Sequence, residues 1–326
     1  MSTPPRPIVG VDVSKQALDA HARASGSGRR FANSPAGIAE LLAWVRALQP
    51  APERIVFEST GPYQKPAVGA LLAEGLPAVV VNARQVRDFA KGTGRLAKTD
   101  AIDAAVLAHF GEVVATTVRP LEGPQARELR ELLDRRGQLV AMLAGEKNHR
   151  HAAGAASPKV RKNIDRHIDY LEKQIADLEG RMDALVEASA AFRAKDEVLR
   201  SIVGIGPQVS RTLLAHLPEL GQRSRQGIAA LVGLAPFPED SGTLSRARHI
   251  RGGRAKVRLA LYQAAVAAIR HCPAMKAFYA SLKGRGKAST VAIIAVARKL
   301  LVLANALVRT MSRYRRPANS VCSQTS

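Results

Sequence analysis

The sequence is poor in cysteine and contains no uninterrupted apolar segment long enough to cross a membrane. Its two cysteines, Cys272 and Cys322, are too few for a disulfide framework and lack the paired spacing of a zinc site. The apolar run at 290–308 is interrupted by Arg298 and Lys299, which favours a buried helix over a membrane span. Residues 1–7 have no apolar stretch of the kind found in a secretory signal. We therefore expect a soluble intracellular protein.

Acidic residues are missing from the last part of the chain. The 326 residues include 49 Lys or Arg and 27 Asp or Glu, which gives a formal net charge of +22. Seventeen of these cations lie in residues 241–326, where there is no Asp or Glu. A folded segment with charge of one sign repels itself unless a polyanion neutralises it, so nucleic acid is the expected partner. A solvated basic surface or an anionic membrane surface fits less well, because this region also contains long apolar helical stretches.

The first part of the chain alternates between strand patterns and helix patterns. Short runs rich in β-branched or alternating apolar residues predict strands at 8–13, 18–23, 29–32, 54–58 and 78–82. One helix is predicted to begin at 33–35, a second to end at Leu72, and a third to cover 99–109. This order predicts a mixed sheet flanked by helices.

The middle and the end of the chain have helical patterns. A heptad spacing of apolar residues predicts a coiled-coil seam formed by Ile164, Ile168, Leu171, Ile175, Leu178, Met182 and Leu185. With an earlier helix over 127–149, it predicts a helical hairpin that folds on itself or pairs with another protomer. We expect an α/β domain at 1–118, a coiled-coil hairpin at 119–198 and a small basic all-α domain at 199–326.

A Gly-Ile-Gly turn lies between two helical stretches of the third region. Gly204 and Gly206 precede Pro207, and such a turn looks like a helix-hairpin-helix element whose N–H groups hold a DNA phosphate. An ordinary corner between two helices is the alternative interpretation.

Four carboxylates of the first domain are candidates for a metal site: Asp12, Glu58, Asp100 and Asp103. Asp12 lies among apolar residues of a predicted strand, where an unpaired carboxylate is unfavourable. Clustered carboxylates repel one another unless divalent cations bind between them, and oxygen ligands alone favour Mg²⁺ or Mn²⁺. The separate alternatives are a helix cap at Asp100, a first-turn charge at Asp103 and a surface ion pair at Glu58. Spacing alone leaves both interpretations open.

A serine in a basic loop is a candidate nucleophile. Ser241 lies between Asp240 and Gly242, and its hydroxyl needs proton removal or metal coordination to become reactive. The same three residues are also typical of a simple turn. Cations that we expect to contact nucleic-acid phosphates follow closely in the sequence: Arg246, Arg248, Arg251, Arg254, Lys256 and Arg258.

Three blocks around the carboxylates resemble a known family. Gly10-Val-Asp12-Val-Ser-Lys15, Phe57-Glu58-Ser-Thr-Gly-Pro-Tyr63 and Lys98-Thr-Asp100-Ala-Ile-Asp103-Ala are similar to those of the DEDD insertion-sequence transposases, the IS-one-ten type, which include the Piv/MooV DNA invertases. Gly204-Ile-Gly206, Gly233-Leu-Ala-Pro236 and Ser241-Gly242 resemble the C-terminal transposase domain of that family. The resemblance extends from about residue 8 to 310, with no departure at a motif position.

The resemblance implies a fold, a chemistry and partners. It implies an RNase H-like, RuvC-type first domain in which Asp12, Glu58, Asp100 and Asp103 bind Mg²⁺, with Mn²⁺ as a substitute. It also implies that Ser241 joins covalently to DNA, and that a structured noncoding bridge RNA pairs with donor and target DNA. Members act in the bacterial cytoplasm as multimers, dimers or tetramers, in which one protomer supplies the tetrad and another the serine.

Two other functions remain open from the residues themselves. One is a metal-dependent nuclease or junction resolvase in which water attacks, so that no covalent adduct forms. The other is a nucleic-acid scaffold in which the carboxylates have only structural roles. Four ordered acidic positions argue against the scaffold, and the match around Ser241 argues against the nuclease.

Overall fold

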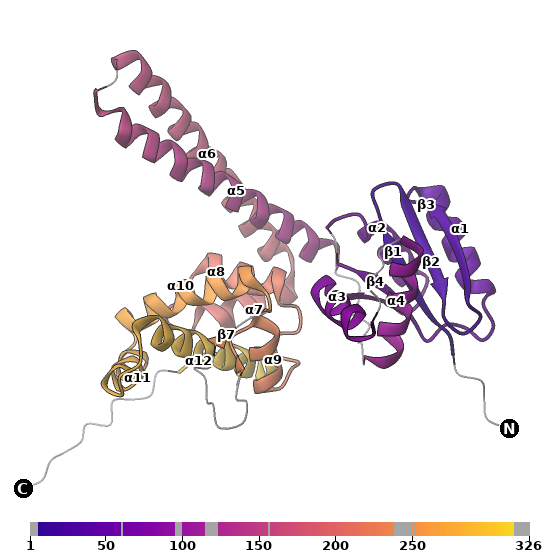
Figure 1. Cartoon of the computed structure of the whole chain (residues 1–326). Coiled ribbons are helices and arrows are strands. Elements are labelled where there is room, and N and C mark those ends of the chain that lie inside the picture. Colours follow the sequence, from indigo (N-terminus) through magenta and orange to yellow (C-terminus); the bar gives the residue numbers. More distant parts are fainter. Residues whose placement is uncertain are drawn as a thin grey trace, which may run out of the picture. The chain divides into compact units, whose positions relative to one another are not determined.

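The chain folds into two units, Met1–Glu122 and Gly123–Ser326, each described here by itself. The computed structural model describes residues 6–59, 61–94, 100–114, 123–155, 157–237, 249–250 and 252–315, with the backbone alone at 100–102, 155, 237 and 249. Figure 1 shows a sheet with its helices in the first unit and helices in the second.

The first unit is built on a five-stranded mixed sheet. Its strands are β1 (Ile8–Val13), β2 (Ala17–Ala22), β3 (Ser27–Ala32), β4 (Arg54–Glu58) and β5 (Ala78–Val81), in the order β3-β2-β1-β4-β5. β1, β2 and β3 pair antiparallel, whereas β4 runs parallel to both β1 and β5. The prediction of a mixed sheet is confirmed, and this sheet is compatible with an RNase H-like domain.

Helices cover both faces of this sheet. They are α1 (Pro35–Ala47), α2 (Lys65–Ala73), α3 (Ala83–Gly92) and α4 (Asp100–Val113). One apolar cluster joins Val11 and Phe57 to Leu41 of α1 and Leu71 of α2. The other face is covered by α3 and α4, in a cluster that includes Ile8, Val56, Val86, Leu107 and Phe110. Because side chains alternate along a strand, the odd and even positions of β1 face different helices.

The second unit begins with a helical hairpin formed by α5 (Pro124–Ala152) and α6 (Pro158–Ala188). A short 3₁₀ turn (Ala153–Ala155) lies between the two helices. The two helices pack along each other, so the hairpin folds on itself within one chain (Figure 1). Ion pairs cross between them, from Arg136 to Glu179 at 2.7 Å and from Lys147 to Glu172 at 2.8 Å. The intramolecular arrangement is therefore the one that the structure adopts.

Six further helices and a two-stranded ribbon complete this unit among the residues that the structure describes. They are α7 (Ala190–Arg200), α8 (Pro207–His216), α9 (Arg225–Val232), β6 (Pro236–Phe237), β7 (His249–Ile250), α10 (Ala255–His271), α11 (Pro273–Gly284) and α12 (Ser289–Thr310). Helix α12 is the one described helix long and apolar enough to cross a membrane. Its Val296, Leu300 and Leu301 are fully buried in the core of this unit, as expected for the interrupted apolar run.

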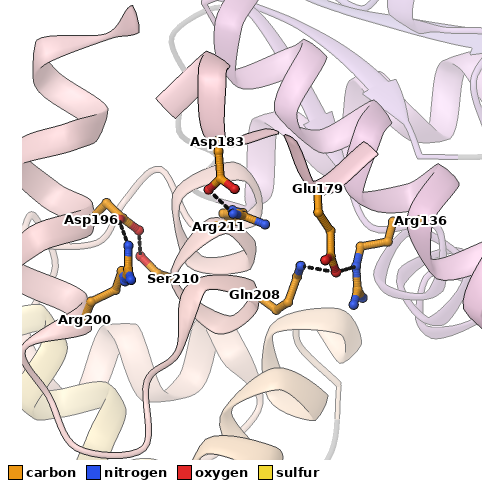
Figure 2. A network of polar contacts seen from close by, with 8 residues as sticks. All are labelled: Arg136, Glu179, Asp183, Asp196, Arg200, Gln208, Ser210 and Arg211. Atoms are coloured by element: carbon orange, nitrogen blue, oxygen red, sulfur yellow. Dashed lines mark hydrogen bonds and ion pairs between the residues drawn. The ribbon is translucent and has the colours of Figure 1, made fainter. Parts of the chain in front are cut away.

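Polar contacts join the base of the hairpin to α8, and a hydrogen bond from Ser210 to Asp196 joins α8 to α7 (Figure 2). Glu179 accepts hydrogen bonds from Arg136 at 2.7 Å and from Gln208 at 2.8 Å. The buried Arg211 of α8 pairs with Asp183 of α6. Leu129 of α5 and Met182 of α6 also belong to the apolar core shared with the C-terminal helices. These contacts explain why the hairpin and the following helices form one unit.

Candidate functional site

Two of the predicted site residues end neighbouring parallel strands. Asp12 lies near the end of β1 and Glu58 is the last residue of β4. The register pairs Val11 with Phe57, so the next positions along the two strands are Asp12 and Glu58. Both are half-buried. By the alternation of strand side chains, Asp12 shares a face with Ile8 and Glu58 shares it with Val56, which is the face covered by α3 and α4.

Helix α4 runs antiparallel to these strands across that face. A Cβ atom at Gly10 would overlap the carbonyl oxygen of Ala104, so glycine permits close contact between β1 and α4. At the other end of the helix, Arg54 donates a hydrogen bond to the Gly111 carbonyl oxygen at 3.1 Å. The amino end of α4 therefore lies toward the carboxyl ends of the strands.

The fold consequently places the predicted acidic positions at one end of the sheet. Asp103 directly precedes the Ala104 contact with Gly10, and Asp100 is the first residue of α4. Asp100 has only its backbone described, so its carboxylate lies outside the described side chains. Two parallel strands and one covering helix thus bring Asp12, Glu58 and Asp103, which are far apart in the sequence, to the same end of the sheet.

The carboxylates at this end of the sheet suit a hard divalent cation, because carboxylate oxygens are the ligands that Mg²⁺ and Mn²⁺ prefer. Among the described side chains, no three His, Cys, Asp or Glu residues are grouped closely enough to hold a metal ion. The four-carboxylate site therefore stays a prediction, supported by strand register and the direction of α4.

The predicted nucleophile and several predicted phosphate contacts fall outside the described residues. These are Ser241, Arg246, Arg248 and Arg251. The described residues nearest to them form the β6–β7 ribbon, in which Pro236 pairs with Ile250 and Phe237 with His249. The segment 238–248, which contains Ser241, therefore begins and ends at the same ribbon.

Three of the predicted phosphate contacts, Arg254, Lys256 and Arg258, have partners within the protein. Arg254 donates two hydrogen bonds of 2.6 Å to the Glu219 carboxylate and one of 2.7 Å to the His216 carbonyl oxygen. Its side chain is 21% exposed, so a phosphate would have to compete for a satisfied, largely buried guanidinium. The more exposed Lys256 pairs with Asp134 of α5. Arg254 therefore has internal partners, and its contact with nucleic acid stays a prediction.

The Gly-Ile-Gly turn connects α7 to α8 and packs against α10. Gly204 has a positive φ of 98°, and a Cβ atom there would lie 2.5 Å from the Ala264 carbonyl oxygen. Gly206 is exposed and occupies the N-cap of α8, which no side chain caps. Gly204 is therefore required for packing, while phosphate binding by the N–H groups near Gly206 stays a prediction.

A groove in the second unit adjoins this turn. It has a volume of about 840 Å³ and is lined by α5, α8 and α10, with Gln208, His216 and Lys256 among its polar residues. Burial lowers the pKa of His216, and Lys256, Arg130 and Arg254 lower it further, whereas Asp134 opposes the shift. His216 is therefore neutral at pH 7 and adds no cation to this groove.

Sequence reasoning missed a basic face on α3. Arg84, Arg87 and Lys91 are exposed on this helix, opposite Val86, which is buried against α4. Asp88 is exposed on the same face and pairs with Arg84 at 3.9 Å, which leaves the face with a net positive charge. The helix follows β5, whose Val81 is paired with Glu58, so it starts at the end of the sheet that carries the predicted carboxylates. The spacing of three and four residues between the cations is the signal that could have identified this face.

Comparisons with known proteins match both units. A family model described as Transposase covers residues 9–153, and one described as Transposase IS116/IS110/IS902 family covers residues 196–280. The chain is 27% identical over 316 residues to the pilin gene-inverting protein of Moraxella bovis, covering 92% of this chain and 95% of that protein. It is 25% identical over 252 residues to an insertion element IS900 protein of Mycobacterium paratuberculosis, covering 75% and 62% of the two chains. An insertion element IS110 protein of Streptomyces coelicolor is 30% identical over 139 residues, 42% of this chain and 33% of that protein.

Proposed function

Because the chain belongs to the IS116/IS110/IS902 family of transposases, we propose that this DNA transposase cleaves and rejoins DNA through a covalent serine–phosphate link. The observation that carries the proposal is the meeting of Asp12 and Glu58 at the carboxyl ends of paired parallel strands, with the amino end of α4 directed toward them. We place its action in the bacterial cytoplasm, where transposases typically work.

The four carboxylates would bind divalent metal ions, on which the DEDD transposase family in general depends. Asp12, Glu58, Asp100 and Asp103 would supply the oxygen ligands, with Mg²⁺ as the expected ion and Mn²⁺ as a substitute. When bound, such ions supply Lewis acidity and stabilise negative charge on the attacking and leaving oxygens of a phosphodiester. The partial burial of Asp12 and Glu58 would limit the movement of their side chains and keep the oxygens of both carboxylates directed at the same metal position.

Ser241 would carry the DNA strand between cleavage and rejoining. Its Oγ attacks the phosphorus of a phosphodiester, and the bond from phosphorus to one deoxyribose oxygen breaks. The serine proton is lost to solvent or a carboxylate, and the departing oxygen takes up a proton to become a hydroxyl. Attack by a new deoxyribose hydroxyl then reverses these steps, restores the serine and needs no ATP, because one phosphoester bond replaces another.

The exposed face of α3 would hold the DNA backbone beside the carboxylates, so replacing Arg84, Arg87 and Lys91 with glutamine is expected to weaken DNA binding. Each lost phosphate contact should make the slope of log K against log salt shallower by about 0.9. Fluorescence anisotropy with labelled duplex DNA, measured at several salt concentrations, checks this result.

A matched triple variant provides the control for α3. Arg29, Arg30 and Arg46 are also exposed; the first two lie on β3, at the opposite edge of the sheet from β5, and Arg46 lies on α1. Their replacement by glutamine removes the same charge and should change the salt slope little. Equal slopes for the two triple variants would contradict a specific role for α3.

We further propose that a structured noncoding bridge RNA guides the protein and that a homo-oligomer completes each active site. The cationic segment 241–326 supports an RNA partner in addition to DNA, because its charge exceeds that of the rest of the chain. Gly206 and Lys256 remain candidate contacts for either nucleic acid, as do Arg246, Arg248 and Arg251.

A recombination assay tests the guidance by RNA. The coding sequence is expressed in a bacterial host with or without the noncoding DNA that flanks it, together with a plasmid carrying the element ends and an insertion site. We expect recombinant plasmids only when the flanking DNA is transcribed, and restoration when the RNA is supplied from a second plasmid. Equal recombination without any of this RNA would contradict guidance.

A further inference from the structure

The ends of the segment that contains Ser241 are brought together twice by described residues. The inner closure is the β6–β7 ribbon, which pairs Phe237 with His249. The outer closure lies just beyond it, where the end of α9 meets the residues before α10. The chain therefore leaves and returns through one narrow base, which we call the collar (Gly233, Gly252, Gly253, Arg254 and Arg258, with Glu219).

The outer closure depends on three glycines. Gly233 ends α9 in the left-handed conformation, with φ of 78°, and Gly252 and Gly253 both have φ of 68°. A Cβ atom at Gly233 would overlap the Gly252 carbonyl oxygen, and one at Gly253 would overlap the Gly233 nitrogen. Only residues without a side chain allow these two backbone stretches to touch in this way.

Two arginines fasten the collar to its surroundings. Arg258 donates hydrogen bonds to the carbonyl oxygens of Gly252 at 2.6 Å and Val232 at 3.3 Å, so it holds both sides of the closure. Arg254 is bound in bidentate fashion to Glu219, whose side chain is 12% exposed. It also donates to the His216 carbonyl oxygen at the end of α8. A bidentate pair fixes direction as well as distance, which a single-point lysine contact would not do.

We propose that Arg254, Arg258 and Glu219 are positioning residues for the nucleophile segment 238–248, rather than contacts to nucleic acid. This inference rests on the proposed function of Ser241. Fixing both ends of a segment reduces the range of positions open to the residues between them. A reaction that requires close alignment of an oxygen and a phosphorus is sensitive to displacements of about 1 Å, which can change its rate about a hundredfold.

The test separates the covalent step from DNA binding. The variants Arg254→Gln, Arg254→Lys, Glu219→Gln and the double Arg254→Gln/Glu219→Gln are made in the full chain. Affinity is measured with labelled duplex DNA, and the rate of formation of denaturant-resistant protein–DNA adduct is measured at saturating DNA with the guide RNA present. Arg313→Gln is the matched control, because it breaks another ion pair of this unit, Arg313 with Glu197 at 2.5 Å.

We expect Arg254→Gln to slow adduct formation about 10- to 100-fold while DNA affinity changes less than about twofold. Arg254→Lys should recover part of the rate, and the double variant should be no slower than the slower single variant, because both act through one pair. A loss of affinity and salt slope with an unchanged rate at saturation would overturn the inference, because that is the behaviour of a phosphate contact.

Hydrogen exchange supplies a readout that does not depend on the chemistry. In Arg254→Gln, and in Arg258→Gln as a second variant, the amides of the β6–β7 ribbon should exchange faster than in Arg313→Gln. Unchanged exchange in both variants would overturn the collar even if no adduct is ever detected. Conversely, the two variants could show faster exchange while the wild type forms no adduct that depends on Ser241. That result would support the collar and contradict the proposed nucleophile.

Discussion

Replacing Ser241 with alanine is expected to abolish the covalent protein–DNA product and to lower recombination by on the order of a thousandfold or more. The change removes the only oxygen that the proposed reaction uses to hold the cleaved strand, so neither adduct nor rejoined product can form. End-labelled DNA that stays with the protein in denaturing gel electrophoresis measures the adduct directly. Ser245→Ala is the matched control, because it removes a hydroxyl from the same segment.

Two outcomes of this experiment would contradict the assignment. Full recombination by Ser241→Ala would show that another group carries the strand. Metal-dependent cleavage by the wild type with no adduct under any condition would favour water as the nucleophile, as in a nuclease or junction resolvase. Retained DNA binding by Ser241→Ala is expected, because the change removes no positive charge.

Replacing Asp12 with asparagine is expected to reduce strand cleavage by on the order of a thousandfold and to leave DNA binding intact. Asparagine has nearly the same shape but no negative charge, so it weakens the attraction for a divalent cation at the end of β1. Cleavage of labelled DNA should stop when EDTA is added to the wild type and return with excess Mg²⁺. The variant should stay inactive at every Mg²⁺ concentration.

Asp19→Asn provides the control for this experiment. Asp19 is directly opposite Asp12 on the neighbouring antiparallel strand and forms an ion pair with Arg30 at 3.7 Å. The control removes the same charge one strand away and should keep nearly full cleavage. Equal losses in the two variants would point to a general electrostatic or folding effect rather than to a ligand at Asp12.

Local patterns predicted the strands and the long helices, because each depends on residues close in sequence. The β-branched run of β1 and the heptad spacing of α6 are such patterns. Helix α3 was missed because its apolar side is short and its exposed side is highly charged, with three cations and Asp88. The pairing of the hairpin with itself also depends on contacts between distant residues, such as Arg136 with Glu179, 43 positions apart.

The site residues at the ends of strands could be predicted from the sequence. Contacts between side chains that are far apart in the sequence could not. Asp12 was identified from its apolar neighbours, and the register of β1 with β4 then explains how Glu58 comes beside it. Arg254 was predicted as a phosphate contact because it lies in a run of cations, and its ion pair within the protein was not foreseen. Its partner Glu219 is 35 positions away, and no local pattern connects the two. Gly204 likewise serves a contact with α10 that the sequence could not show.

The most direct test of the account is to locate manganese by its anomalous scattering in crystals of the protein bound to DNA. We expect a peak bound jointly by the carboxylates of Asp12 and Glu58, with Asp100 and Asp103 completing the ligands, and its disappearance in Asp12→Asn. Manganese bound elsewhere in an active complex, with none at these two strand ends, would contradict the central claim.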